Sequence, residues 1–215
     1  MFCQDRDILC IEPVVYQGQA TPPISQPASG TDGEIITSTF TSLSADFISS
    51  GVQAGMVLCT TGTIISEGNV WEIIEVVSSN QLTISSLRAS SDGPVISAGN
   101  MNGAKYYVRT LAAMIKQVSL ELSERFRRLG EAEGISADDF VDSEILAAAT
   151  AYGVLAKVYR SMADSSISDV RWLKAEHYAE EYERMCNRLC LSVDVNGDGV
   201  AEQTRSLGNV RLKRD

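Results

Sequence analysis

Two kinds of hydrophobic pattern divide the chain near residue 105. Before this point, short runs rich in β-branched residues are separated by turn residues, a pattern that is typical of strands. The runs read EIITSTF, MVLCTTGTII, VWEIIEVV and QLTISSLR, and Gly68-Asn69 and Ser78-Ser79-Asn80 separate the later ones. Four or five strands within about 60 residues predict a small antiparallel barrel or sandwich.

From Val108 onward, apolar residues recur every three or four positions, which is the spacing of one face of a helix. We expect three amphipathic helices that pack on their apolar stripes. Gly130 is the predicted C-cap of the first helix, and Asp142 and Ser168 are the predicted N-caps of the other two. The three stripes are Leu111, Met114, Ile115, Val118, Leu122, Phe126 and Leu129; Ile145, Leu146, Ala149, Tyr152, Leu155, Ala156, Tyr159 and Met162; and Trp172, Ala175, Tyr178, Ala179, Tyr182, Met185, Cys186 and Leu189.

The patterns together predict an α+β fold with a helical core of three main helices, an inserted small antiparallel β-barrel or sandwich module, and an extended C-terminal tail. The segment 18–33 contains Pro22, Pro23 and Pro27 among Gly and Ser, which is typical of a linker. The predicted parts are an N-terminal segment and Pro-rich linker at 1–33, the β module at 34–98, the helical core at 99–191 and the tail at 192–215.

Charge separates the body of the chain from its end. The 215 residues include 28 acidic and 18 basic residues, which give a net charge of −10. Such a surface argues against a protein that clamps nucleic acid by its phosphates. Residues 205–215 hold four basic residues against Asp215 alone, so the basic charge gathers at the C-terminus. This tail has too little apolar surface to fold alone, and we expect it to become ordered on a partner.

Targeting signals and catalytic motifs are not evident in the pattern. The first residues lack the basic start and the unbroken apolar stretch of a secretory signal, and no run is long enough to span a membrane. One His and five Cys offer no nucleophile beside a base. His177 is expected on a helix surface and Cys186 in the core, so we predict no enzymatic activity. Because targeting and membrane-spanning segments are not evident, we also predict synthesis in the cytoplasm and no membrane contact.

One segment has the spacing of a calcium-binding loop. Asp194, Asn196, Asp198 and Glu202 stand at positions 1, 3, 5 and 9 of such a loop. Arg205 replaces the bidentate acid of position 12, which removes two ligand oxygens. Two interpretations stay open, a Gly-Asp-Gly turn with no cofactor or a bound Ca²⁺. The second would suit a calcium-dependent binding or adhesion module, in which the β module is the active part.

Three stretches in order resemble one family. They are DRDILCIEPVV at the start, FISSGVQAGMVL followed by VWEIIEVVSSNQLTISSLR, and a helix that runs into LCLSVDVNGDGVAEQTRSLGNVRLKRD. In this order they resemble the head-to-tail adaptor (connector, neck) proteins of tailed bacteriophages and related prophages. The resemblance implies a structural virion protein of the neck, which forms a homo-oligomeric ring, usually twelvefold, under the portal protein. The ring would link the portal to a downstream tail component, and DNA would pass through its channel.

The resemblance also implies that the C-terminal tail of each copy reaches into the portal. Physical arguments agree, because an acidic channel lets DNA slide while a basic tail can pair with acidic clefts on the ring above. An extended tail could also add a strand there and place its apolar side chains in pockets. The expected portal-binding residues are Arg205, Leu207, Val210, Arg211, Leu212, Lys213 and Arg214.

Overall fold

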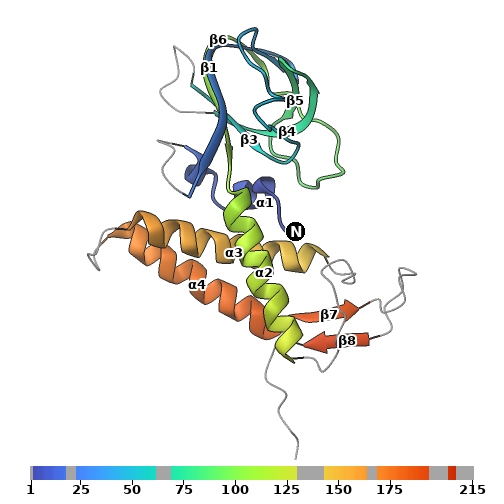
Figure 1. The fold of residues 1–215 in the computed structure, drawn as a ribbon, viewed down its shortest axis with the longest axis vertical. Coiled ribbons are helices and arrows are strands. Elements are labelled where there is room, and N and C mark those ends of the chain that lie inside the picture. The colour runs from blue at the N-terminus through green and yellow to red at the C-terminus, as the bar shows by residue number, and fades with distance from the viewer. Residues whose placement is uncertain are drawn as a thin grey trace, which may run out of the picture. The chain divides into compact units, whose positions relative to one another are not determined.

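The structure is a computed structural model. It describes residues 2–17, 23–61, 69–129, 143–163, 169–193 and 203–206. The chain divides into two compact units. We call Gln4–Ala112 the barrel unit, and Met1–Cys3 with Ala113–Asp215 the helical unit. Figure 1 shows the strands of the first unit and the helices of the second.

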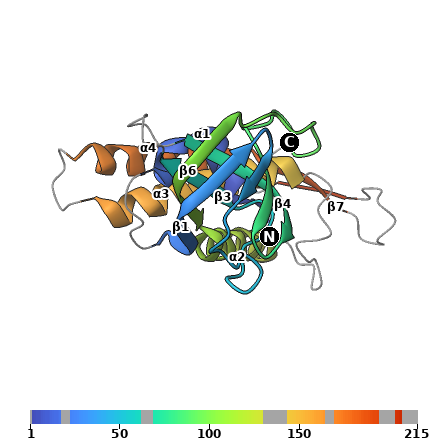
Figure 2. The same cartoon turned by 90° about the horizontal axis from the view of Figure 1, so that it is seen from above.

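The barrel unit contains a closed barrel of six antiparallel strands, in the order β1-β2-β5-β4-β3-β6. Pairing of the first strand with the last completes the ring of strands, and Figure 2 shows β1 and β6 side by side. Bulges interrupt the register between β1 and β6 and between β4 and β5, and such bulges let strands bend around a small barrel. The strands are β1 (Ser25–Ile36), β2 (Thr39–Thr41), β3 (Val57–Thr61), β4 (Asn69–Ser78), β5 (Gln81–Ser85) and β6 (Asn100–Thr110).

Side chains fill the interior of the barrel. Phe40 and Tyr106 meet edge to face, with ring centroids 5.0 Å apart, and Phe47 packs on both rings. A Cβ on Gly30 would lie 2.6 Å from the Tyr106 ring, so β1 can pass this close only with a glycine. The core residues are Ile35, Phe40, Phe47, Val52, Leu58, Ile73, Leu82, Ile84, Tyr106 and Val108.

A short helix and a 3-10 turn precede the barrel. Helix α1 spans Asp5–Ile11 and η1 spans Pro13–Tyr16. The buried Asp5 carboxylate accepts hydrogen bonds from Tyr16 Oη (2.8 Å), Thr110 Oγ1 (2.6 Å) and the backbone N–H of Leu111 (2.6 Å). The start of the unit is therefore fixed to the residues that end β6.

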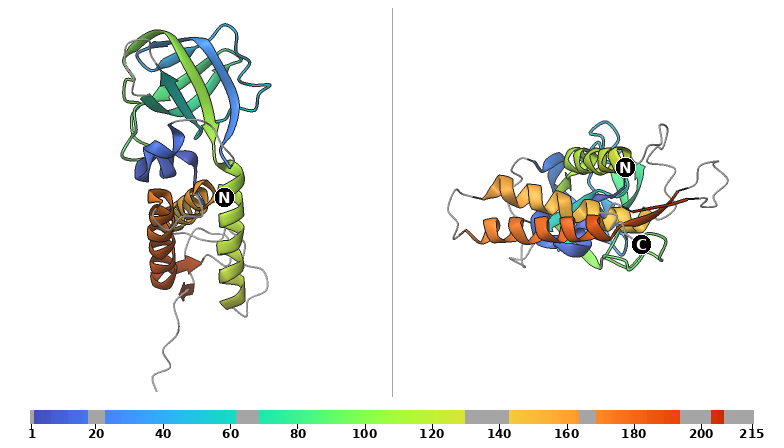
Figure 3. Two further views of the ribbon diagram at one scale, coloured as in Figure 1. Left: turned by 90° about the vertical axis from the view of Figure 1, so that its left-hand side faces the viewer. Right: turned by 90° about the horizontal axis from the view of Figure 1, so that it is seen from below.

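The helical unit consists of three long helices and a small sheet. The elements are α2 (Ala112–Leu129), α3 (Ser143–Met162), α4 (Val170–Arg188), β7 (Cys190–Val193) and β8 (Gln203–Ser206). Helices α3 and α4 lie side by side (Figure 3). Gly153 of α3 lies where the three helices meet, because a Cβ there would lie 2.8 Å from Val118 of α2 and 3.1 Å from the ring of Tyr182 of α4.

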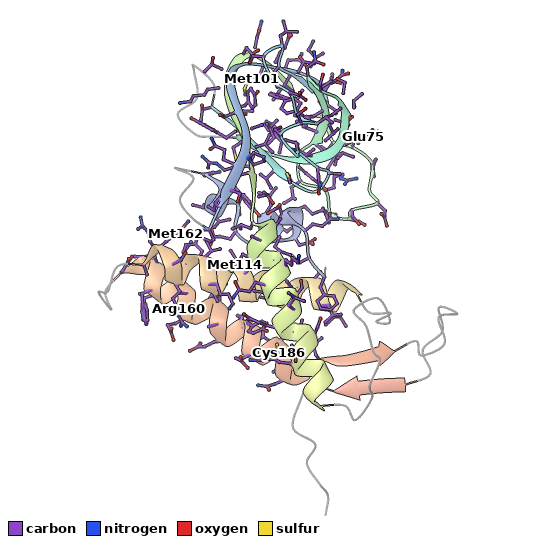
Figure 4. The ribbon with its side chains drawn as sticks, in the orientation of Figure 1. Glu75, Met101, Met114, Arg160, Met162 and Cys186 are labelled. Atoms are coloured by element: carbon purple, nitrogen blue, oxygen red, sulfur yellow. The ribbon has the colours of Figure 1, made fainter. Side chains whose placement is uncertain are left out.

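The described members of the predicted helical stripes are buried or half-buried, except Ile145, which is 44% exposed. Leu111, Ile115, Val118 and Leu122 are at most 1% exposed, and Cys186 is buried beside Leu189. Figure 4 labels Cys186 near the end of α4. Helix α4 differs at its start. Its N-cap is Asp169, which accepts a hydrogen bond from the N–H of Arg171 at 2.9 Å, and the predicted cap Ser168 lies outside the described residues, as do Gly130 and Asp142.

The predicted fold class, a helical core with an inserted β module, is wrong. The closed barrel is a compact unit of its own, and the described residues also form four α-helices, so only the mixed character remains. Strand β6 falls in the range assigned to the helical core, and β1 starts at Ser25, inside the expected linker. Buried Ala104, Tyr106 and Val108 alternate with outward residues along β6, which is a strand pattern.

The C-terminal segment differs from the expected extended tail as well. Strands β7 and β8 pair antiparallel, with Cys190 opposite Ser206 and Val193 opposite Gln203. The segment predicted as tail, 192–215, therefore contributes to a two-stranded sheet before its last residues. No helix in the described ranges is long and apolar enough to cross a membrane.

Candidate interaction surface

An open groove of about 630 Å³ runs along the solvent-facing side of α2. Leu120 is 58% exposed at its centre, although the opposite side of the same helix is fully buried. Residues three or four positions apart share one helix face, so the spacing of the lining residues places them on one stripe. The lining residues are Ala113, Lys116, Gln117, Leu120, Glu121, Glu124 and Arg125, and we call this stripe the α2 groove.

Two ion pairs fix the charged wall of the α2 groove. Glu121 accepts hydrogen bonds from Lys157 Nζ of α3 (2.8 Å) and Gln117 Nε2 (3.0 Å). Burial raises the pKa of Glu121, but these hydrogen bonds outweigh burial and the net pKa is lowered. Arg125 donates to Glu183 of α4 at 2.5 and 3.1 Å, and these bonds raise its pKa further.

The groove suits contact with another protein better than chemistry on a small molecule. An exposed leucine lies among groups of both signs, and Glu121 and Arg125 already have partners within the unit. Protein–protein interfaces commonly have an apolar centre and a polar rim, and this helix face has both. The sequence pattern did not single out this face, since Leu120 lies outside the predicted apolar stripe.

Three described thiols stay protonated, and the single histidine is exposed on a helix. Burial raises the pKa of Cys59 to about 11 and also raises the pKa of Cys10 and Cys186, so all three thiols stay protonated near neutral pH. His177 is exposed on α4 with its ring beside Tyr178. Within the described ranges, no three His, Cys, Asp or Glu side chains come close enough to hold a metal ion.

A buried charge cluster in the barrel unit was not predicted. Glu72 of β4 accepts two hydrogen bonds from Arg88, at 2.9 and 3.1 Å, and forms an ion pair with Arg6 Nε at 2.7 Å. Arg6 also donates to the carbonyl of Arg88 (3.1 Å), and Arg88 donates to that of Gly93 (2.7 Å). The cluster joins α1, β4 and the segment after β5, so it acts as an internal support of the unit.

The predicted binding residues lie almost entirely outside the described structure. The metal candidates Asp194, Asn196, Asp198 and Glu202 fall in the sequence between β7 and β8, beyond the described ranges. Arg205 belongs to β8, opposite Leu191 in the sheet. The other tail residues predicted to bind the portal, Leu207, Val210, Arg211, Leu212, Lys213 and Arg214, are not among the described residues.

Comparison with known proteins identified no similar protein. No family model matches the chain, and neither the curated proteins nor the solved structures contain a match.

Proposed function

We propose that the chain is a non-enzymatic head-to-tail adaptor of a tailed bacteriophage. In this proposal, copies form a ring under the portal protein in the neck of the virion, and the basic tail of each copy enters the portal. The ring also receives a downstream tail component and encloses part of the DNA channel. The sequence resemblance is the origin of the proposal, and the physical properties below support it.

The surface of the barrel unit carries the proposal. Its described carboxylates that are exposed or half-buried are Asp7, Asp32, Glu34, Asp46, Glu75 and Asp92. Arg6, Arg88 and Arg109 are buried, so Lys105 is the one exposed basic side chain among the described residues of this unit. Such a surface repels phosphates, and a protein that surrounds DNA in transit benefits because the duplex does not adhere.

The α2 groove supports contact between copies. It combines an exposed leucine with Lys116 and Glu124 on one helix face. A ring needs a surface on each copy that fits a different surface of its neighbour. We assign the groove to this contact, in which Leu120 would be covered by the adjacent copy.

Deletion of residues 205–215 tests the role of the tail. The deletion removes half of β8, so we expect the truncated chain to keep the circular dichroism signal of its helices and barrel and to lose binding to portal rings, since each tail would supply one of many tethered contacts. Leu120→Asp is the matched variant for the groove. It should block ring formation, while the tails of single copies still bind the portal. Normal portal binding by the truncated chain would count strongly against the proposal.

Electron microscopy of purified virions gives the most direct test. The proposal expects this chain to be traced in the neck, between portal and tail. Calcium calorimetry addresses the alternative of a calcium-dependent binding module. A stoichiometric site whose loss abolishes binding of a ligand would favour that alternative over the adaptor.

A further inference from the structure

The outer side of α4 carries exposed apolar side chains near its start. Val170 is 66% exposed and Leu173 is 58% exposed. His177 and Glu180 are also exposed and lie on the same side, because steps of three or four residues return to one face of a helix. We call this face the α4 stripe, and it consists of Val170, Leu173, His177, Glu180 and Arg184.

The α4 stripe and the α2 groove both lie on the sides of their helices that face away from the packed interior of the helical unit. The groove lies opposite Val118 and Leu122 of α2, which are fully buried. The stripe lies opposite Ala175 and Cys186 of α4, which are also buried. One copy therefore cannot bring its own α4 stripe against its own α2 groove, and a contact between the two needs a second copy. Figure 3 shows α2 and α4 as separate helices of this unit.

Each of the two surfaces holds a charged side chain of opposite sign that lacks a partner. Lys116 in the groove and Glu180 on the stripe are exposed, and neither side chain forms an ion pair or a hydrogen bond with the described residues. Arg184, the other charged residue of the stripe, already pairs with Glu181. A cation and an anion that are unpaired within their own chain are complementary across an interface.

We propose that the α4 stripe of a second copy occupies the α2 groove, with the two helices antiparallel. The inference rests on the proposed contact between copies and names the surface that completes it. When Lys116 lies opposite Glu180, Leu120 lies between Leu173 and His177 of the second copy, since four residues of either helix rise about 6 Å. The exposed leucines then cover each other at the centre of the contact, and the ion pair lies at its rim.

The positions of the charges select the antiparallel direction. Lys116 precedes Leu120 in the sequence, whereas Glu180 follows Leu173. An antiparallel pair centred on the two leucines brings both charges to the same end of the contact, and a parallel pair would place them at opposite ends. The contact joins two different surfaces, so its repetition builds a ring or an open chain of copies.

Two charge-reversed, full-length variants test the contact. Lys116→Glu sets like charges opposite each other between its own copies, and so does Glu180→Lys. In sedimentation velocity we expect each variant alone to associate at least about fivefold more weakly than the wild type. An equimolar mixture should regain association to within about twofold of the wild type, because every contact between the two variants pairs opposite charges.

The control pair is Lys105→Glu and Glu75→Lys, which reverses exposed charges of the barrel unit. Each of these variants should associate like the wild type, alone and in their mixture. Leu173→Asp probes the apolar centre of the α4 stripe, and it should weaken association about tenfold or more while its circular dichroism spectrum is unchanged.

A wild type that stays monomeric at its highest soluble concentration would overturn the inference, and so would a mixture that associates no better than its two components. Electron microscopy of virions separates this result from the proposed function. A ring in the neck whose copies meet through other surfaces would overturn the inference and leave the proposed function intact. A chain that is absent from virions but associates through the α2 groove and the α4 stripe would overturn the function and support the contact.

Discussion

At the scale of single residues, one threonine of the barrel unit has a backbone conformation that is unfavourable for its residue type. Thr37, between β1 and β2, has φ of 58°, where a β-branched residue is strained. Its surroundings hold it there, because its N–H donates to Asn100 Oδ1 (3.0 Å) and its carbonyl accepts from the N–H of Ala98 (2.7 Å). The turn is therefore fixed by contacts with the segment before β6.

Relief of this strain should be measurable. We expect Thr37→Asn to raise the free energy of unfolding by about 0.5–1 kcal/mol, since Asn adopts left-handed backbone more easily. Thr39→Asn, at a regular strand position, should instead lower it by a similar amount. Urea unfolding followed by circular dichroism compares the two. A loss of stability in Thr37→Asn would show that the threonine side chain outweighs the strain.

Asp32 makes part of the stability depend on acid. Hydrogen bonds from Ser42 and Ser44 lower the pKa of Asp32 from 3.8 to about 2. A lowered folded pKa adds stability above pH 3.8, and that stability is lost as the pH falls toward about 2. Because the group is exposed, we expect the contribution to be about 1 kcal/mol or less.

The variant Asp32→Asn tests this dependence. It should be less stable than the wild type at neutral pH, and the difference in melting temperature should shrink as the pH falls from about 5 to 3. Asp92→Asn, also exposed, is the control. A difference between wild type and Asp32→Asn that stays constant with pH would contradict the assignment.

At the scale of elements, Glu72 holds three segments of the barrel unit together. Its carboxylate is 2% exposed and contacts two arginines. We expect Glu72→Gln to lower the free energy of unfolding by about 3–5 kcal/mol, because it removes the carboxylate that two buried arginines share and leaves Arg6 with only Asp7 at 3.5 Å. Glu75→Gln lies three residues along the same strand but is exposed, and it should change stability by less than about 0.5 kcal/mol. Equal effects of both changes on thermal unfolding would argue against the cluster as a support.

The helices depend on close approach at Gly153. We expect Gly153→Val to lower the free energy of unfolding by about 2–3 kcal/mol, since the added methyl groups would overlap Val118 and Tyr182. Ala113→Val makes a β-branched residue at an exposed helix position, where only about 0.5 kcal/mol is expected. Urea titration of both variants separates crowding from helix propensity. A stable Gly153→Val chain would mean that the helices can move apart.

Elements with clear periodicity were predictable, and elements set by distant contacts were not. The apolar stripes of α2 and α4 follow directly from spacing, as buried Val118 and Cys186 show. Strand β1 was read as linker because of its prolines and glycines, yet Gly30 is needed there to pass Tyr106. The start of α2 depends on Asp5, which is more than a hundred residues away in the sequence, and no local pattern reveals such a partner.

The acidic surface of the barrel unit and the α2 groove also differ in how far they could be predicted from the sequence. Acidic character could be read from composition, but the places of Glu34 on β1 and Glu75 on β4, three strands apart in the closed barrel, depend on strand pairing. The α2 groove was not predicted, because a single exposed leucine among charged residues looks like any solvent-facing helix. The predicted calcium loop and most of the tail lie outside the described residues, so those assignments remain predictions.

At the scale of the whole molecule, net charge governs which partners can approach. With −10 per chain, we expect no saturable binding of a short DNA duplex near physiological salt, because the phosphates are repelled. Fluorescence anisotropy with a labelled duplex measures this. Salt-sensitive binding that disappears when residues 205–215 are deleted would instead assign the basic segment to nucleic acid.

Barrel closure also sets an order of events during synthesis. Strand β1 pairs with β6, so the barrel can close only after residues 100–110 have been synthesised. Until then the nascent chain exposes apolar strand faces and an unpaired edge, and such intermediates are prone to aggregate. The ribosome covers the most recently made residues, so closure coincides with synthesis of the first long helix. Cells with slowed translation over this stretch should therefore accumulate more insoluble chain.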